Sequence, residues 1–175
     1  SPFVALKRKF WPDCPFETVL VTEHVPTIED EQTATRPAFD RVIACGKGTN
    51  WASRLVQALD QITTPYVLML CDDYFLEAPV STDLLLHRLE QLKSFNAVNL
   101  RLVPNPKHGE ARSDGLMEYP KNTAYCISTL AGFWNREFLQ QLARSASSIW
   151  EFERYGSFSV GTEERPILAT CVREF

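Results

Sequence analysis

Residues 48–76 read GTNWASRLVQALDQITTPYVLMLCDDYFL, and this stretch decides the fold class. Asn50 is a good N-cap residue for a helix that runs to about Ile62, with apolar residues along one face. Pro65 separates this helix from residues 66–70, YVLML, which are wholly apolar and predict a strand buried on both faces. The stretch therefore reads as a helix followed by an inner strand of a sheet.

Strand-like and helix-like runs alternate on both sides of this stretch. The expected strands cover residues 16–23, 40–45, 97–103, 123–130 and 166–172; the expected helices cover residues 1–11, a segment capped by Ser81, Thr82 or Asp83, residues 135–144, and a shorter segment capped by Ser147 or Ser148. Strands that alternate with helices predict an α/β domain with a largely parallel sheet and right-handed crossovers.

Two stretches lack periodicity. The polar residues 24–39 predict a surface excursion. Residues 104–122 are long enough for an irregular loop to have a function, and we interpret them as a candidate acceptor-side or lid segment. His108 within this loop is either a candidate ligand or a solvated side chain.

The composition excludes several classes of protein. The chain has 175 residues, of which 45% are hydrophobic, and a net charge of -4, which describes one ordinary globular domain. No apolar run approaches the roughly 20 residues of a membrane span, and the mild acidity argues against a nucleic-acid partner. Five cysteines without C-x-x-C spacing indicate neither a disulfide framework nor a zinc site, and favour a reducing compartment, the cytosol.

Asp72 and Asp73 directly follow the apolar strand at residues 66–70. Ligands of open α/β sheets bind beyond the carboxyl ends of the strands, and two adjacent carboxylates are costly there unless a cation or a hydrogen-bond network compensates them. Carboxylate oxygens suit Mg²⁺ or Mn²⁺. The alternative is that one Asp caps the following turn while the other is solvated.

The start of the helix after Asn50 offers a second feature. Its exposed N–H groups and positive dipole end suit a phosphate, and Arg54, one turn into the helix, is placed to reach the same phosphate. The alternative is that Arg54 is a solvated helix residue. The sequence has no Walker loop and no G-x-G-x-x-G motif, so kinase-like or nicotinamide chemistry is unsupported.

Several segments together resemble a known family. They are FWPDCPFETVLVTE (10–23), the 48–76 stretch, LAGFWNREFLQQL (130–142) and SSIWEFE (147–153). This combination resembles bacterial GT-A type glycosyltransferases of the family-two-like kind, in particular a group with K-x-W-P-D-C-P, D-D-x-F and W-[DE]-F-E patterns among surface-polysaccharide enzymes. The resemblance covers nearly the whole chain. It implies a Rossmann-like, three-layer α/β sandwich with a mostly parallel central sheet, formed as a single catalytic domain by residues 1–175.

The resemblance also implies roles for the residues of the donor site. Asp72 and Asp73 correspond to the D-x-D-type motif; Asp73 would bind the Mn²⁺ or Mg²⁺ ion that bridges the donor diphosphate, and Asp72 would contact the ribose or the sugar. Arg54 matches a basic position near the nucleotide, with Trp51 packed beside it. The alternative for Trp51 is plain core packing.

The catalytic base would come from the W-[DE]-F-E segment, where Glu151 and Glu153 are the candidates. On a helix these two glutamates project about 100° to either side of Phe152, so only one is expected to face the site. The alternative is that both are solvated surface residues. The implied reaction is transfer of a sugar, with inversion, from a nucleotide-diphosphate donor to a hydroxyl of a saccharide or lipid-linked saccharide acceptor.

This reading implies polysaccharide synthesis in the cytoplasm, or in peripheral association with the inner face of the membrane. Family members begin with a strand that precedes the helix at residue 1 and continue past the W-[DE]-F-E helix, so we expect this chain to lack its first strand and a C-terminal segment. Two other functions stay open: a non-catalytic nucleotide- or carbohydrate-binding domain of GT-A shape, and a nucleotidyltransferase.

Overall fold

The computed structural model describes residues 2–24 and 39–175, so most of the polar stretch 24–39 lies outside the described residues. The helices are α1 (Pro2–Phe10), α3 (Trp51–Asp60), α4 (Thr82–Ser94), α5 (Arg136–Arg144) and α6 (Ile149–Ser159), which continues into the 3-10 helix η1 (Val160–Thr162). The strands are β1 (Val19–Thr22), β2 (Arg41–Ala44), β3 (Tyr66–Met69), β4 (Asn99–Arg101), β5 (Glu110–Ala111), β6 (Leu116–Glu118), β7 (Gly132–Asn135) and β8 (Ile167–Thr170).

The strands form two sheets, and the larger one is mixed. It has six strands in the order β3-β7-β4-β8-β6-β5, whereas β1 and β2 form a separate parallel pair. Within the larger sheet only β4 and β8 pair in parallel; the other four pairings are antiparallel. The α/β class is confirmed, and the prediction of a mostly parallel sheet is wrong.

The sheet is not mostly parallel because of the connection between β4 and β7. A parallel connection needs a crossover, usually a helix, and the chain has no helix in this interval. It folds instead into the β5–β6 hairpin and returns as β7, which runs antiparallel between β3 and β4. The expected irregular loop at 104–122 therefore contains two strands, whose two and three residues are too short to give a recognisable period.

Residues 123–130 do not form the strand that their composition predicts. Their backbone groups bond to side chains rather than to a neighbouring strand. The Ile127 amide donates to Ser157 Oγ at 3.1 Å, and the Cys126 carbonyl accepts from Arg101 Nη2 at 2.8 Å. These side-chain partners replace a sheet ladder, and the strand begins only after this segment, as β7.

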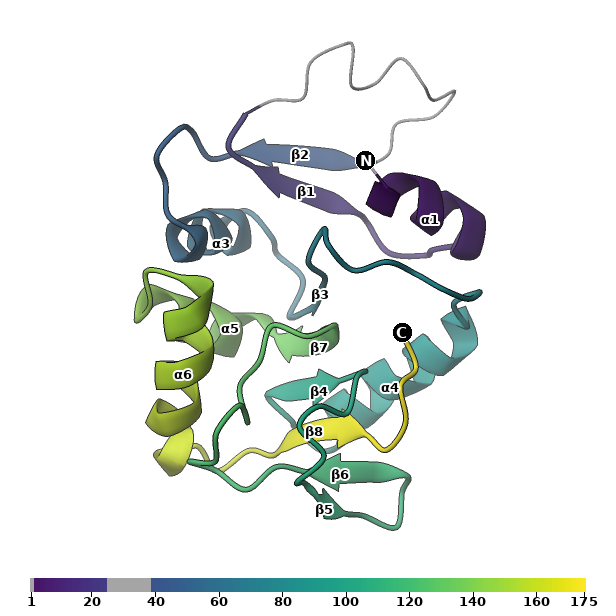
Figure 1. Cartoon of the computed structure of the whole chain (residues 1–175), viewed down its shortest axis with the longest axis vertical. Helices are drawn as coiled ribbons and strands as arrows, with labels where there is room; N and C mark the ends of the chain where they lie inside the picture. Colours follow the sequence, from purple (N-terminus) through teal and green to yellow (C-terminus); the bar gives the residue numbers. More distant parts are fainter. Residues whose placement is uncertain (1, 25–38) are drawn as a thin grey trace.

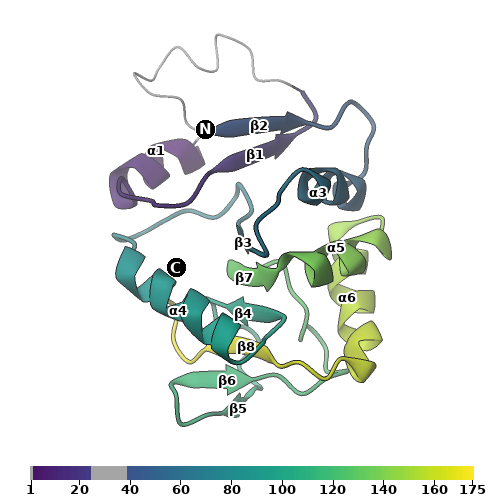
Figure 2. The same ribbon diagram turned by 180° about the vertical axis from the view of Figure 1, so that it is seen from behind.

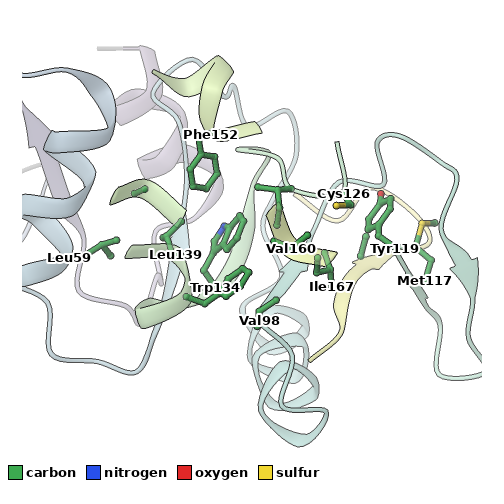
Figure 3. Close-up of a cluster of buried hydrophobic side chains, with 14 residues drawn as sticks. Leu59, Val98, Met117, Tyr119, Cys126, Trp134, Leu139, Phe152, Val160 and Ile167 are labelled. Atoms are coloured by element: carbon green, nitrogen blue, oxygen red, sulfur yellow. The ribbon is translucent and has the colours of Figure 1, made fainter. Parts of the chain in front are cut away.

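Helices cover both faces of the larger sheet (Figure 1 and Figure 2). Leu85 and Leu92 of α4 pack on one face. On the other face α3, α5 and α6 enclose a second cluster around Trp134 and Phe152, whose ring centroids lie 5.9 Å apart (Figure 3). No helix in the two described ranges is long and apolar enough to cross a membrane.

The register of β7 aligns the ends of three strands. Gly132 is paired with Met69 of β3 on one side and with Arg101 of β4 on the other. The carboxyl ends of β3 and β4 and the amino end of β7 therefore lie together at one end of the sheet. The segments that adjoin this end carry the candidate site.

The β1–β2 pair lies beyond the β3 edge of the larger sheet. Along the long axis of the molecule β1 lies between β2 and β3 (Figure 1). Within residues 2–24 and 39–175 no ladder joins β1 to β3, so each of these strands has one unpaired edge. Residues Val19–Thr22 and Tyr66–Met69, which form these strands, are mainly apolar.

Replacing Gly132 by Ala tests the close approach of β7 to β4. The added Cβ would lie 2.9 Å from the Leu100 carbonyl oxygen and 3.1 Å from Arg101 Cα, and backbone atoms of a sheet cannot move aside singly. We expect Gly132→Ala to lower the free energy of unfolding in urea by about 1–3 kcal/mol, as overpacking does.

Gly109→Ala is the matched control. Its Cβ would meet Met117 Cγ and Sδ at 3.0 Å and Met117 Cβ at 3.1 Å; the first two atoms can rotate away, so only the Cβ contact needs a small shift. We expect a smaller loss for this variant. Equal losses for the two variants would show that the strand approach at Gly132 is not a special constraint.

Candidate functional site

The acidic pair forms an exposed turn beyond β3. The Tyr74 amide donates to the Cys71 carbonyl at 3.2 Å, which closes a turn with Asp72 and Asp73 at its centre. Both aspartates are exposed, and neither carboxylate has a hydrogen bond or an ion pair in the described part of the chain. The alternative in which one of them caps the turn is therefore not seen, and both keep their oxygens free for a ligand.

Glu153 of α6 is held by one of its two carboxylate oxygens. Its Oε1 accepts from Ser128 Oγ at 3.0 Å, from the Thr129 amide at 2.7 Å and from Thr129 Oγ1 at 2.8 Å. Its Oε2 has no hydrogen bond within the described ranges. The Thr129 carbonyl in turn accepts a weak hydrogen bond from Cys71 Sγ at 3.8 Å, so one residue links Glu153 to the end of β3.

The charge of Glu153 acts on the residues that flank the acidic turn. Burial is the main cause that raises the pKa of the Cys71 thiol to about 11, and the negative charges of Asp73, Asp72 and Glu153 add to it. Burial also raises the pKa of Tyr74 to about 12, and Glu153 again contributes. Three carboxylates from two distant segments thus act on the same point.

Glu151 has a different position, in the cap of α6. Its amide donates to Ser148 Oγ at 3.2 Å, and its Oε2 accepts from the Ser147 amide at 2.8 Å and from the Ser147 hydroxyl. This arrangement is a variant of the capping box, in which the glutamate bonds to the residue before the N-cap, and these hydrogen bonds lower the pKa of the Glu151 carboxyl. No contact joins Glu151 to the acidic turn in the described residues.

Trp51 and Arg54, both on α3, are placed differently. The Trp51 ring meets Phe152 edge to face at a centroid distance of 5.2 Å, so it packs against the residue that precedes Glu153. Arg54 forms an ion pair with Glu23 and donates to the Thr49 carbonyl at 3.2 Å. The structure therefore brings Trp51 to α6, whereas no described interaction brings Arg54 to Asp72 or Asp73.

His108 lies outside this group. It is exposed, its Nε2 lies 3.3 Å from Thr123 Oγ1, and its ring contacts Tyr119 at a centroid distance of 5.5 Å. The loop around it stays a predicted lid.

Sequence reasoning missed three residues of the site. Ser128 and Thr129 hold Glu153, and Arg101 lies buried at the end of β4. A signal was present only for Arg101, which is the single charge in the otherwise apolar run AVNLRLV. The role of Ser128 and Thr129 depends on the long-range approach of α6, which leaves no local pattern.

The donor set of the turn fits a hard divalent cation that is shared with a substrate. No cluster of three or more His, Cys, Asp or Glu side chains is placed to hold a metal ion in residues 2–24 and 39–175. The protein supplies the two free carboxylates of Asp72 and Asp73. Mg²⁺ and Mn²⁺ bind one or two carboxylates and complete their shell with phosphate oxygens and water.

A groove in the described part of the chain lies elsewhere. It has a volume of about 530 Å³ and runs between α5 and residues 159–165. None of the six predicted site residues lines it. We place the candidate site at the acidic turn because the free carboxylates and the fixed Glu153 are there, whereas the groove contains an Arg165–Glu163 pair that satisfies itself.

Comparison of the chain with protein-family models, with curated proteins and with solved structures gives no match.

The reactivity of Cys71 reports on the charges of the site. We expect alkylation of Cys71 at pH 8 to be slow relative to the exposed Cys171, because the thiolate is the reactive form. Glu153→Gln should speed the alkylation of Cys71 about two- to fivefold, because a fall in pKa of one unit raises the thiolate fraction about tenfold. Mass spectrometry of the labelled peptides measures both rates.

Glu151→Gln is the control for this measurement. It removes the same charge from the same helix without touching the acidic turn, and it should leave the Cys71 rate unchanged. A wild-type rate in Glu153→Gln would contradict the placement of Glu153 beside the turn.

Proposed function

We propose that this protein is a GT-A type glycosyltransferase, which transfers a sugar from a nucleotide-diphosphate donor to a hydroxyl of a saccharide or lipid-linked saccharide acceptor. One observation carries the proposal: the Glu153 carboxylate is fixed through one oxygen by Ser128 and Thr129, and the Thr129 carbonyl bonds to Cys71, which directly precedes the two exposed carboxylates of Asp72 and Asp73 at a strand end. The first group suits proton transfer and the other two suit a cation. Glycosyl transfer to a hydroxyl needs both.

Glu153 is the proposed general base. Three donors to Oε1 fix its orientation, and Oε2 keeps its lone pairs free to accept the proton of the acceptor hydroxyl. Glu151 is not assigned this role, because no contact in the described residues joins it to the acidic turn. Glu153 is chosen because its partner Thr129 also bonds to Cys71, next to that turn.

Asp72 and Asp73 are the proposed donor-side residues. Asp73 would hold a Mn²⁺ or Mg²⁺ ion, and Asp72 would accept a hydrogen bond from the ribose or the sugar. When bound, the cation would stabilise the negative charge that develops on the leaving nucleotide diphosphate. The turn keeps both carboxylates exposed and unpaired, so that the donor can reach them.

Trp51 and Arg54 support the donor site less directly. Trp51 packs on Phe152 and so fixes the start of α3 against the helix that carries Glu153. Arg54 would bind a donor phosphate only after exchanging its ion pair with Glu23, whose side chain is 43% exposed and so accessible for that exchange.

The GT-A assignment starts from the sequence resemblance. It is supported by helices on both faces of the larger sheet and by an acidic turn at the carboxyl end of β3.

One alternative is favoured by a specific observation. Because Arg54 is already paired with Glu23, the chain also fits a non-catalytic nucleotide- or carbohydrate-binding domain of the same shape. Binding of a nucleotide diphosphate without any transfer or hydrolysis would select this alternative.

Glu153→Gln tests the proposed base. We expect the variant to lose at least about 100-fold in turnover, the lower range for a lost general base, while calorimetry shows unchanged donor binding. Release of nucleoside diphosphate from a panel of nucleotide sugars with Mn²⁺ measures turnover. Glu151→Gln is the matched control, and its turnover in the same assay should stay within about twofold of the wild-type value.

Two results would contradict the assignment of Glu153 as the general base. Wild-type turnover in Glu153→Gln would place the base elsewhere. Equal losses in the two variants would show that the effect arises from α6 as a whole rather than from one carboxylate.

A further inference from the structure

Arg101 is a buried charge with no carboxylate partner. Its side chain is 0% exposed, at the end of β4 and on the face of the sheet that α6 covers. Nη1 donates to the Asn105 carbonyl at 2.6 Å, and Nη2 donates to the Tyr125 carbonyl at 3.1 Å and the Cys126 carbonyl at 2.8 Å. Its Nε has no partner, and no acid is bonded to it in the described ranges.

Such a charge is expensive to bury. Removing a guanidinium from water costs several kcal/mol, and carbonyl dipoles and the Tyr119 ring, 4.6 Å from Arg101 Cζ, offset only part of this. Burial accordingly lowers the pKa of Arg101. An apolar side chain at this position would pack without that cost. The role of Arg101 therefore lies in the groups that its guanidinium donors hold together.

The guanidinium group of Arg101 joins two segments at the carboxyl end of β4, where the candidate site lies. One contains Asn105, and the other contains Tyr125 and Cys126. The Tyr119 hydroxyl donates to the Pro106 carbonyl at 2.7 Å and ties the first segment to the end of β6. Figure 3 shows Tyr119 and Cys126 near each other in this part of the core.

The second segment leads directly to Glu153. Cys126 is followed by Ile127, whose amide and carbonyl both bond to Ser157 Oγ of α6 at 3.1 and 3.2 Å. Two residues later Thr129 donates its amide and its hydroxyl to Glu153. The segment is thus held by Arg101 at one end and presents its donors to Glu153 at the other.

The charge of Arg101 also reaches the acidic turn. The negative charge of Glu153 favours the charged form of Arg101, and the positive charge of Arg101 lowers the pKa of Tyr74, against the larger effects that raise it. Arg101 is therefore a buried positive charge within electrostatic range of Glu153 and of Tyr74, which closes the acidic turn.

We propose that Arg101 is a positioning residue, whose three carbonyl contacts fix residues 125–129 so that Thr129 holds Glu153 in a reactive orientation. This inference rests on the proposed function, in which Glu153 is the general base. Arg101 does not touch substrate, because it is fully buried. It acts through Tyr125, Cys126 and Thr129.

Hydrogen exchange at the Thr129 amide tests the positioning directly. Arg101→Met removes the charge and all three contacts; Arg101→Lys keeps the charge, but a single ammonium cannot replace the guanidinium. In both variants we expect exchange at Thr129 to rise at least about tenfold by NMR, the effect of a local opening made 1.4 kcal/mol easier, while amides of α4 keep their protection. Turnover should fall at least tenfold with the donor KM unchanged within twofold.

Arg88→Met is the matched control. Arg88 is also largely buried, and it pairs with Glu174 next to α4, on the opposite face of the sheet. Its loss should leave Thr129 exchange and turnover as in the wild type. Arg101→Lys keeps the test valid if Arg101→Met does not fold.

Two results would overturn the inference. Wild-type protection of Thr129 in Arg101→Lys and Arg101→Met would show that Arg101 does not fix the segment. Increased exchange with undiminished turnover would show that the positioning has no role in the reaction. If the wild-type protein shows no transfer at all, the proposed function fails, and Thr129 exchange alone still decides whether Arg101 positions Glu153.

Discussion

The close approach of β7 to β4 at Gly132 is the constraint on which the site depends. A Cβ at this position would lie 2.9 Å from the Leu100 carbonyl oxygen, so a larger residue would push the strands apart. Because the approach is possible, Met69, Gly132 and Arg101 lie in one row across the sheet. The acidic turn and the segment that contains Thr129 then adjoin the same end of the sheet, where Cys71 bonds to the Thr129 carbonyl and Thr129 bonds to Glu153.

The charges of the site are distributed unequally. Within the described residues Asp72 and Asp73 are exposed and unbonded, Glu153 is fixed through one oxygen, and Arg101 is fully buried. The positive charge of Arg101 interacts with Glu153, so the two aspartates leave an excess of negative charge at the acidic turn. A divalent cation with a phosphate-bearing substrate would compensate that excess, because such an ion needs few protein ligands.

The local features of the fold were predictable from the sequence, whereas the direction of β7 was not. Asn50, Ser81 and Ser148 cap α3, α4 and α6 as the sequence predicts, because capping depends on residues three positions apart. The antiparallel course of β7 depends on pairing with strands that are distant in the chain. Residues 123–130 have the composition of a strand, but side chains from β4 and α6 satisfy their backbone groups.

The candidate site was predictable as a set of residues and not as an arrangement. Strand-end position identified Asp72 and Asp73, and helical geometry limited the base to one of two glutamates. Periodicity alone does not choose between them, because both flank Phe152 at equal angles. The contacts of Ser147 with Glu151 and of Thr129 with Glu153 separate their roles. The first is a local contact at a helix start, whereas the second joins residues 24 positions apart and has no signal in the local sequence.

The proposal that Asp73 binds a divalent cation is tested most directly by locating Mn²⁺ on the protein when a nucleoside diphosphate is present. Paramagnetic broadening of backbone amide signals during a Mn²⁺ titration measures this in the intact protein. We expect the signals of residues 71–74 and Thr129 to broaden first. Asp73→Asn should abolish this selectivity, whereas Asp83→Asn, at an exposed position of α4, should not. Broadening that begins at Glu163 and Glu164, or that is unchanged in Asp73→Asn, would contradict it.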